Sequence, residues 1–394
     1  MWRLLGKKWM RDLALGAGLL AMTVALVLYP KEAVASAREG LELCGNVIVP
    51  SLFPFFVLSS LVVELGLSGY LGRALEGIMR PLFAVSGACA SAFALGFVGG
   101  YPVGAKTAIE LYEKGMCTKT EAERLLSFCN NSGPAFILGV VGAGVFSSSR
   151  VGVLLCLAHA AASVCVGVLF RFYGRSSEKR ERRRGPSFEA RRFSAAFTNS
   201  IKSSALSTLN ICAFVVFFTV VIRLLFLTGF LPALAQALGA VFAPLGFSSA
   251  QGEQLLTGFL EVSSGVWSLK GEGALAGRVS MAAFMLGWAG VSVHCQVLSF
   301  ISGSGLSVRT YLLGKLLHGG LSALLVTALF RLLPFRLPVS AYLAQQVEGI
   351  AGMDFQSAVT VSVVAAWVMF LLFFLTAALA VRKKSGKGRR GVVQ

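Results

Sequence analysis

Charged residues are scarce in this sequence. Asp, Glu, Lys and Arg make up 14% of its 394 residues, whereas hydrophobic residues make up 56% and the mean hydropathy is +0.75. A water-soluble domain of this length needs more charge to cover its surface. The apolar runs are long and continuous, and they lack the alternation of barrel strands, so they predict an all-α polytopic membrane protein.

Histidine is rare, and the motifs of common enzymes are missing. The three histidines lie far apart, and the eight cysteines show no CxxC or Cys/His spacing, which argues against a metal centre. No GxSxG, HExxH or P-loop motif occurs. We therefore expect neither an enzyme nor a bound metal or cofactor.

Acidic residues are half as numerous as basic ones, and the formal net charge is +18. The basic residues gather near the N-terminus, in 171–192 and in 382–390, beside predicted spans, where the positive-inside rule places cytoplasmic segments. Because no aromatic-interleaved basic face accompanies them, nucleic acid is not an expected partner. We expect an integral protein of the cell membrane with both termini in the cytoplasm, and its oligomeric state stays open.

Six apolar runs are long enough to cross the hydrocarbon core of a bilayer. They cover residues 13–29, 45–66, 150–172, 206–228, 308–332 and 355–381. The first 37 residues also imitate a signal peptide, but we interpret them as a retained span. Cleavage there would leave the topology downstream unchanged.

Three further regions are apolar but interrupted: 82–115, 119–147 and 244–301. If 82–115 is a re-entrant hairpin, the loop 171–192, with nine Lys and Arg residues, lies in the cytoplasm. A full crossing by 82–115 would place that loop outside. The charge rule therefore favours the hairpin, and a second hairpin is expected at 244–276.

Sequence similarity between the two halves predicts an internal repeat. Gly69 matches Gly229, Pro81 matches Pro244 and His159 matches His318, with offsets of about 160 residues. The predicted topology inverts the second copy, and inverted repeats with interrupted helices are typical of secondary transporters. The expected units are an N-terminal helix and loop (1–44), a first repeat (45–173), a basic linker (174–205), a second repeat (206–333), and a final loop, span and basic tail (334–394).

The interruptions are the expected binding site. Each hairpin has a polar or glycine-rich tip, "VGGYPVG" and "EVSSG", and a second break follows each, "FCNNSGPAF" and "LGWAGVSVH". Non-helical backbone at membrane depth is tolerated where it is buried or lines a cavity, and the helix N-termini exposed there attract anions. The candidate substrate-binding residues are Gly99, Gly100, Tyr101, Pro102, Lys106, Asn130, Asn131, Ser132, Glu261, Ser263, Ser264 and His294.

Several of these residues have two interpretations. Lys106 either pairs with a substrate carboxylate or extends to the interface, and Glu261 either couples transport or only holds the fold. Tyr101 either stacks on a planar substrate or anchors at an interface. His159 and His318 are expected to serve packing or hydrogen bonding, and Glu121, Glu123 and Arg124 are expected on a short solvated helix.

The segment 75–139, with "MRPLF", "GYPVGAK", "EAERLLSF" and Asn131-Ser132-x-Pro134-x-Phe136-Ile137, resembles the YlbJ (SpoVV) family of sporulation membrane proteins. This resemblance implies a nucleoside-recognition gate domain, similar to the core of concentrative nucleoside transporters. It further implies movement of dipicolinic acid from the mother cell across the outer forespore membrane. Gly133 departs from the family pattern, which has a polar residue there.

We therefore expect a transporter of a small organic anion, with dipicolinate as the preferred substrate. Two alternatives stay open. One is a nucleoside or nucleobase carrier, and the other is a non-transporting membrane assembly factor that docks partners through the basic loop 171–192.

Overall fold

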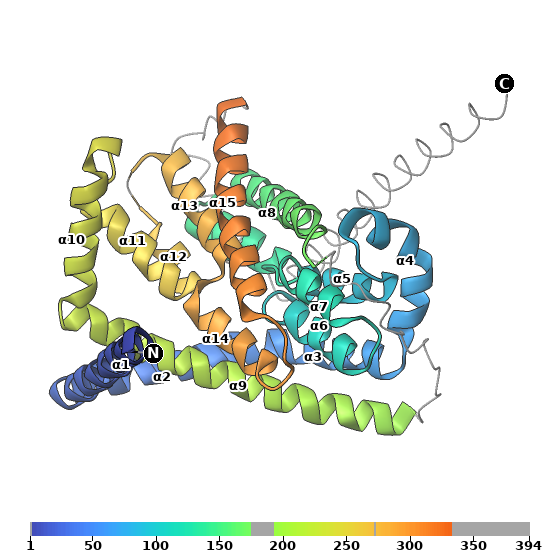
Figure 1. Cartoon of the computed structure of the whole chain (residues 1–394). Coiled ribbons are helices and arrows are strands. Elements are labelled where there is room, and N and C mark those ends of the chain that lie inside the picture. Colours follow the sequence, from blue (N-terminus) through green and yellow to red (C-terminus); the bar gives the residue numbers. More distant parts are fainter. Residues whose placement is uncertain (1, 175–192, 272, 333–394) are drawn as a thin grey trace.

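The computed structural model describes residues 2–174, 193–271 and 273–332, and this part of the chain is helical throughout, without strands (Figure 1). The predicted all-α fold is therefore confirmed. The predicted span 355–381 and most of the basic loop 171–192 lie outside the described residues.

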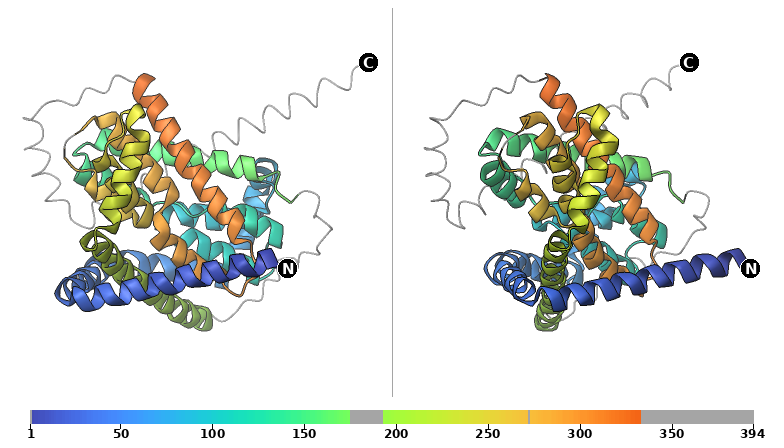
Figure 2. Two further views of the ribbon diagram at one scale, coloured as in Figure 1. Left: turned by 60° about the vertical axis from the view of Figure 1, so that its left-hand side comes forward. Right: turned by 90° about the vertical axis from the view of Figure 1, so that its left-hand side faces the viewer.

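Two helices precede the first repeat. Helix α1 (Trp2–Leu28) turns by 99° into α2 (Pro30–Leu43), and the turn lies at Tyr29, directly before a proline that can only begin a helix. Figures 1 and 2 show α1 along the edge of the molecule, while α2 packs against α9.

The two halves contain similar successions of elements, except that the first half begins with an additional π-helical turn. The first half comprises η1 (Cys44–Ile48), α3 (Val49–Glu64), α4 (Leu67–Phe83), η2 (Gly87–Cys89), α5 (Ala90–Gly99), α6 (Val103–Glu113), α7 (Lys119–Leu126), η3 (Ala135–Val145) and α8 (Ser149–Phe170). The second comprises α9 (Phe193–Leu227), α10 (Phe230–Phe242), η5 (Ala243–Leu245), α11 (Ser249–Leu260), α12 (Val262–Ser268), α13 (Leu275–Trp288), α14 (Gly290–Ile301) and α15 (Val308–Leu332). The opposite orientation of the two copies remains a prediction from the charge pattern.

Four helical segments of the described chain are long and apolar enough to cross a membrane: α8, α9, Leu275–Ile301 and α15. Counting two bent helix pairs as one span each raises the number to six. The predicted span 206–228 lies within α9 except for its last residue, and α9 already begins at Phe193. The predicted span 45–66 is divided between the π-helical turn η1 and α3, which carries Pro54 in its interior.

Both predicted hairpins are present. Helices α5 and α6 pack against each other and meet at Gly100, whose φ of 75° places it in the left-handed region that glycine favours. Helices α11 and α12 meet at Glu261, which is extended (φ −145°) between them. In each pair, the two helices approach closely at glycines. In the second pair, a Cβ atom added to Gly265 of α12 would lie only 2.0 Å from the Cα of Gly258 on α11, so no side chain fits there.

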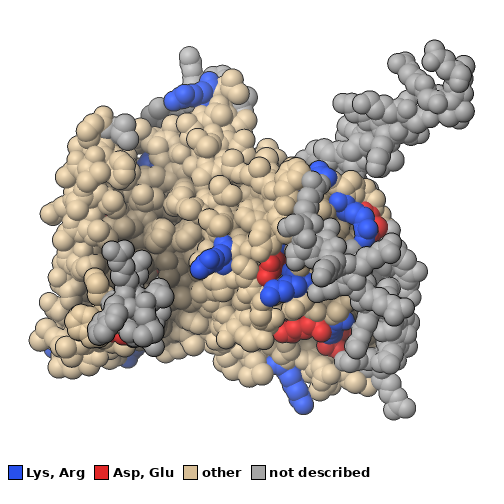
Figure 3. All heavy atoms as spheres, in the orientation of Figure 1, with Lys and Arg blue, Asp and Glu red and all other residues tan. Residues whose placement is uncertain are grey.

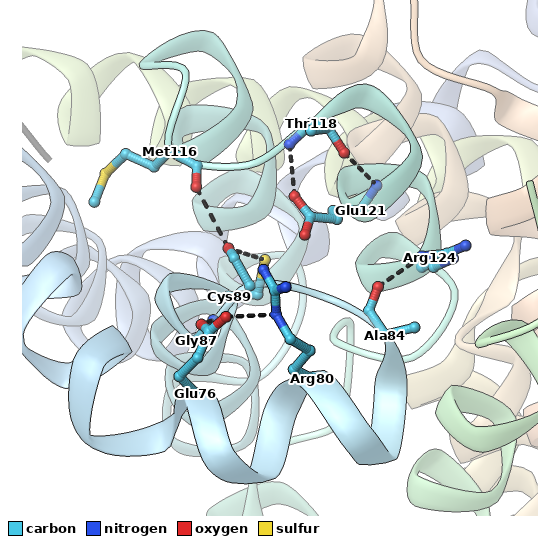
Figure 4. A network of polar contacts seen from close by, with 10 residues as sticks. Glu76, Arg80, Ala84, Gly87, Cys89, Met116, Thr118, Glu121 and Arg124 are labelled. Carbon is cyan, nitrogen blue, oxygen red and sulfur yellow. Dashed lines mark hydrogen bonds and ion pairs between the residues drawn. The ribbon is translucent and has the colours of Figure 1, made fainter. Parts of the chain in front are cut away.

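A polar network holds the corner between α4 and α5, where the chain bends by 91° (Figure 4). Glu76 accepts a hydrogen bond from the Gly87 N–H at 2.5 Å and pairs with Arg80. Arg124 donates to the carbonyl of Ala84 at 2.6 Å. The corner is thereby fixed to α7, whose carboxyl-terminal half supplies the arginine.

The expectation that the 119–126 helix is solvated is wrong. Glu121 and Glu123 are each 5% exposed and Arg124 is fully buried. Glu121 forms a capping box with Thr118, and Arg124 also donates to the carbonyl of Tyr173. Backbone groups and a helix end satisfy these charges, so Glu121, Glu123 and Arg124 are buried, while Lys119 at the start of the helix is exposed.

The surface agrees with a lipid environment. Figure 3 shows few charged side chains on the described face, and most of them gather toward the side where α4, α6 and α7 lie. Large apolar side chains are exposed elsewhere, including Leu206 and Phe217 of α9 and Leu324 of α15. An apolar exterior of this kind is expected of a protein solvated by hydrocarbon.

Candidate functional site

Both predicted helix breaks are present. The first lies between α7 and η3, where residues 130–133 are not helical and precede Pro134. The second lies between α13 and α14, where Ala289 and Gly290 both have positive φ, 79° and 85°. Each break leaves backbone groups without intrahelical partners in the middle of an otherwise apolar region.

Each hairpin tip contacts the break that follows it in the sequence. A Cβ atom on Gly100 would lie 3.1 Å from the nitrogen of Gly133, and one on Gly290 would lie 3.2 Å from the Cα of Glu261. The two halves are also joined at these points, since the Tyr101 hydroxyl donates a hydrogen bond to the Leu286 carbonyl just before the second break. The tips and breaks therefore converge, as the sequence predicts.

A group of polar side chains, here called the central cluster, lies where these elements meet. Its members are Tyr101, Asn130, Asn131, Ser132, His159, His294, Tyr311, Lys315 and His318. All are at most 3% exposed except Tyr101, which is partly buried. The described conformation is thus closed over the cluster.

Lys315 of α15 is the cation of the central cluster. Its ammonium donates to the Asn130 carbonyl at 2.7 Å and lies 3.4 Å from the His318 Nδ1. The same nitrogen stands over the Tyr101 ring, 5.5 Å from its centre. Within residues 2–174, 193–271 and 273–332, Lys315 forms no ion pair.

Tyr311, one helical turn before Lys315, joins the two breaks. Its hydroxyl accepts a hydrogen bond from the Asn130 side-chain amide at 3.3 Å and lies 2.9 Å from the His294 Nδ1. The Trp288 and His294 rings meet edge-on, with their centres 4.2 Å apart. The indole N–H of Trp288 donates a hydrogen bond to the Phe259 carbonyl. One tyrosine of the second half therefore positions side chains from both halves.

The two histidines matched by the repeat meet inside the cluster. Their ring centres lie 4.3 Å apart, and the His318 Nε2 lies 3.0 Å from the His159 carbonyl oxygen. The Ser132 N–H donates to the His159 Nε2 at 3.1 Å, which ties the first break to α8. The prediction that these histidines form hydrogen bonds agrees with these contacts.

Five buried polar atoms of the cluster have no hydrogen-bond partner in the described chain. They are the Oδ1 atoms of Asn130 and Asn131, the Ser132 Oγ, the His159 Nδ1 and the His294 Nε2. Buried polar atoms without partners are uncommon, and each one costs free energy. Their concentration around one ammonium indicates a site that binds a polar small molecule.

Four predicted site residues bond to partners outside the central cluster. Lys106 pairs with Glu110 at 3.4 Å and stands 5.0 Å over the Phe56 ring, so its ammonium lies toward α3. The Glu261 carboxylate accepts hydrogen bonds from the backbone N–H groups of Ser263 and Ser264. These three residues form the N-terminal cap of α12 at the second hairpin tip.

Lys315 and Tyr311 were missed by the sequence reasoning. The signal was present in "LLGKLLHGG", where a lysine stands inside an apolar run that we predicted to span the membrane. A charged residue within a span is by default a candidate functional residue, and His318 follows three positions later on the same helix face.

Replacing Glu261 by alanine is expected to destabilise the second hairpin. The change removes a carboxylate that caps two backbone N–H groups, for a cost of about 1 kcal/mol. Thermal unfolding in detergent should show a lower midpoint for Glu261→Ala than for Glu253→Ala on the preceding helix. Equal midpoints would contradict the capping role.

Comparisons with known proteins agree with this architecture. Residues 47–213 match a family model described as a nucleoside-recognition gate. The chain is 30% identical over 330 residues to the sporulation integral membrane protein YlbJ of Bacillus subtilis (strain 168). The aligned region covers 79% of this chain and 81% of the relative. No solved structure matches it. Its helices, its gate domain and this similarity together show that the chain is an integral membrane protein belonging to the YlbJ family of sporulation proteins.

Proposed function

We propose that this protein is a membrane transporter of a small organic anion, with dipicolinate as the preferred substrate. The observation that carries the proposal is the buried ammonium of Lys315, which has no carboxylate partner among the described residues and stands beside unpartnered polar atoms. A buried cation is costly unless an anion compensates it. A carboxylate substrate supplies that anion.

A planar dicarboxylate fits the chemistry of the cluster. Lys315 can bond one carboxylate, and the amide groups of Asn130 and Asn131 can bond further acceptors once their orientation adapts. Tyr101 offers an aromatic face on the side of Lys315. A ring with two carboxylates and an acceptor nitrogen uses all of these groups together.

Transport requires the closed arrangement to open. The contacts that would have to separate are between the hairpin tips and the breaks, where Tyr101 bonds to Leu286 and Gly100 abuts Gly133. The first of these contacts joins the two repeats. In many secondary transporters the substrate site lies between the repeats, and rocking of one repeat against the other exposes it alternately.

The name of the relative supports a role in sporulation. We therefore place the protein in the outer forespore membrane, moving its substrate from the mother cell, with both termini in the cytoplasm. In this proposal it acts without enzymatic activity or nucleic acid, and its partners are the substrate and the lipid bilayer.

A nucleoside or nucleobase is the second candidate substrate. The matched family model favours it, and asparagine, serine and histidine side chains suit the hydrogen-bonding edges of a base or ribose. A neutral nucleoside, however, leaves the charge of Lys315 uncompensated. The dicarboxylate explains more of the cluster.

Uptake by reconstituted vesicles separates the candidates. Vesicles containing the purified protein should take up labelled dipicolinate in a saturable manner, with labelled uridine entering no faster than into empty vesicles. Uptake of uridine alone would favour the nucleoside carrier. Uptake of neither compound in folded, reconstituted protein would support the assembly-factor alternative.

A further inference from the structure

The contact between His159 and His318 joins equivalent positions of the two halves. His159 lies on α8 and His318 on α15, and both are at most 1% exposed. The hydrogen bond from His318 reaches the backbone carbonyl of the other histidine. Any motion of one half against the other must therefore change the surroundings of both rings.

The hydrogen-bond partners of each imidazole ring show which of its two nitrogens carries the hydrogen. A carbonyl oxygen only accepts, so the His318 Nε2 carries a hydrogen and its Nδ1 is an acceptor that faces Lys315 at 3.4 Å. A backbone N–H only donates, so the His159 Nε2 accepts from Ser132 and the hydrogen of that ring lies on Nδ1. Both rings are therefore neutral in the closed conformation.

Few other ionisable groups surround His318. Lys315 and His159 contact it, and the remaining groups of the cluster and its lining are Tyr101, Cys129, His294 and Tyr311. The charged groups on the packed helices α7, α8 and α13 are bound elsewhere or exposed. Lys119 and Arg150 are exposed, and the others bond to residues outside the cluster: Glu121 to Thr118, Glu123 to Ser307 and Tyr173, Arg124 to Ala84 and Tyr173, and Arg278 to Leu269. No carboxylate of the described chain is bonded to the central cluster.

We infer that His318 takes up a proton when the substrate binds, so that a dianion crosses the membrane together with one proton. This inference rests on the proposed function. A dianion brings two negative charges to a site that holds one ammonium, and a proton on the His318 Nδ1 supplies the second positive charge. The proton enters with the substrate on one side of the membrane and leaves with it on the other.

The same geometry keeps the proton off His318 when no dianion is bound. A protonated Nδ1 no longer accepts a hydrogen bond from Lys315, and it places a second positive charge 3.4 Å from the first. The proton and the dianion therefore favour each other's binding, which is the requirement for coupled transport.

The wild-type protein in vesicles tests the coupling directly. Two sets of vesicles contain a pH-sensitive dye: those preloaded with unlabelled dipicolinate measure exchange of labelled substrate at equal pH, and those without dipicolinate measure net uptake under a pH gradient. The membrane potential is clamped with potassium and valinomycin, because a dianion with one proton carries net negative charge. Acid outside should raise accumulation about tenfold per pH unit, with the dye reporting acidification that follows the substrate, because one proton accompanies each dianion. A sodium gradient should change nothing.

Substitution of His318 by glutamine tests the residue. The glutamine amide can still donate to the His159 carbonyl, but it takes no proton. The ratio of uptake with and without the pH gradient should fall from about tenfold to about one. Cys165→Ser, an exposed position on α8, should keep the wild-type ratio.

The outcomes separate the two proposals. Wild-type protein that exchanges dipicolinate but whose net uptake moves no protons overturns the inference and leaves the proposed function standing, as does a His318→Gln variant that keeps the gradient response. Wild-type protein without any exchange overturns the proposed function. If His318→Gln does not fold, the wild-type dye measurement decides alone.

Discussion

Replacing Lys315 by glutamine is expected to lower dipicolinate uptake about 100-fold, because the variant loses a charge-assisted hydrogen bond to the substrate in a buried site. Glutamine keeps most of the side-chain length and can still donate to the Asn130 carbonyl. The loss should therefore appear in the transport of the anion more than in folding. Initial uptake rates in vesicles with equal amounts of protein measure it.

Lys106 provides the matched comparison, because it is also a buried lysine but is paired with Glu110. The Lys106→Gln variant should lose stability, since it leaves a carboxylate unpaired, yet it should keep its apparent affinity for dipicolinate. If Lys106→Gln loses affinity for dipicolinate and Lys315→Gln does not, Lys106 is the residue that pairs with the substrate carboxylate. That is one of the two interpretations of Lys106 given by the sequence.

Adding a single methyl group at Gly104 is expected to disrupt the first hairpin. A Cβ atom there would lie 2.0 Å from the Cys129 carbonyl oxygen, and the same holds for Gly96 on the opposite arm. The two arms of the hairpin thus enclose the backbone that leads into the first break. Because backbone atoms cannot yield as a flexible side chain can, we expect Gly104→Ala to cost about 3 kcal/mol, the upper end for overpacking.

Gly77 on α4 is the control for this substitution, because no atom lies within 4 Å of a Cβ placed there. Gly77→Ala should be neutral or should stabilise by about 1 kcal/mol through helix propensity. Unfolding midpoints of both variants in the same detergent give the comparison. Equal midpoints would mean that the hairpin and the break do not pack as described.

The interruptions of the fold were predictable because each has a local cause. Gly100 and Pro102 disfavour a continuous helix at the first hairpin tip, and Pro134 disfavours helical backbone at the residue before it. His159 and His318, which the sequence comparison places at equivalent positions of the two halves, lie with their ring centres 4.3 Å apart, and this contact was not predicted. Elements whose form is dictated by their own residues can be found from one sequence.

The centre of the site could not be predicted in the same way. Lys106 follows a hairpin tip in the sequence, but its ammonium is held by Glu110 on its own helix α6 and by the Phe56 ring of α3. Lys315 lies in an uninterrupted helix, and only the packing of α15 against the first break brings it to Asn130. Glu123 and Arg124 show the same limit, since Glu123 bonds to Ser307 and Tyr173 and Arg124 to the carbonyls of Ala84 and Tyr173, all far away in the sequence.

The central claim is that the hairpin tips and helix breaks enclose a site in which Lys315 binds a substrate carboxylate. Equilibrium binding to purified protein tests it with two ligands, dipicolinate and its analogue with one carboxylate replaced by a neutral amide, on wild type and Lys315→Gln. We predict that the wild type prefers the dicarboxylate by at least about tenfold and that the variant loses this preference. An equal preference in both proteins would contradict the account.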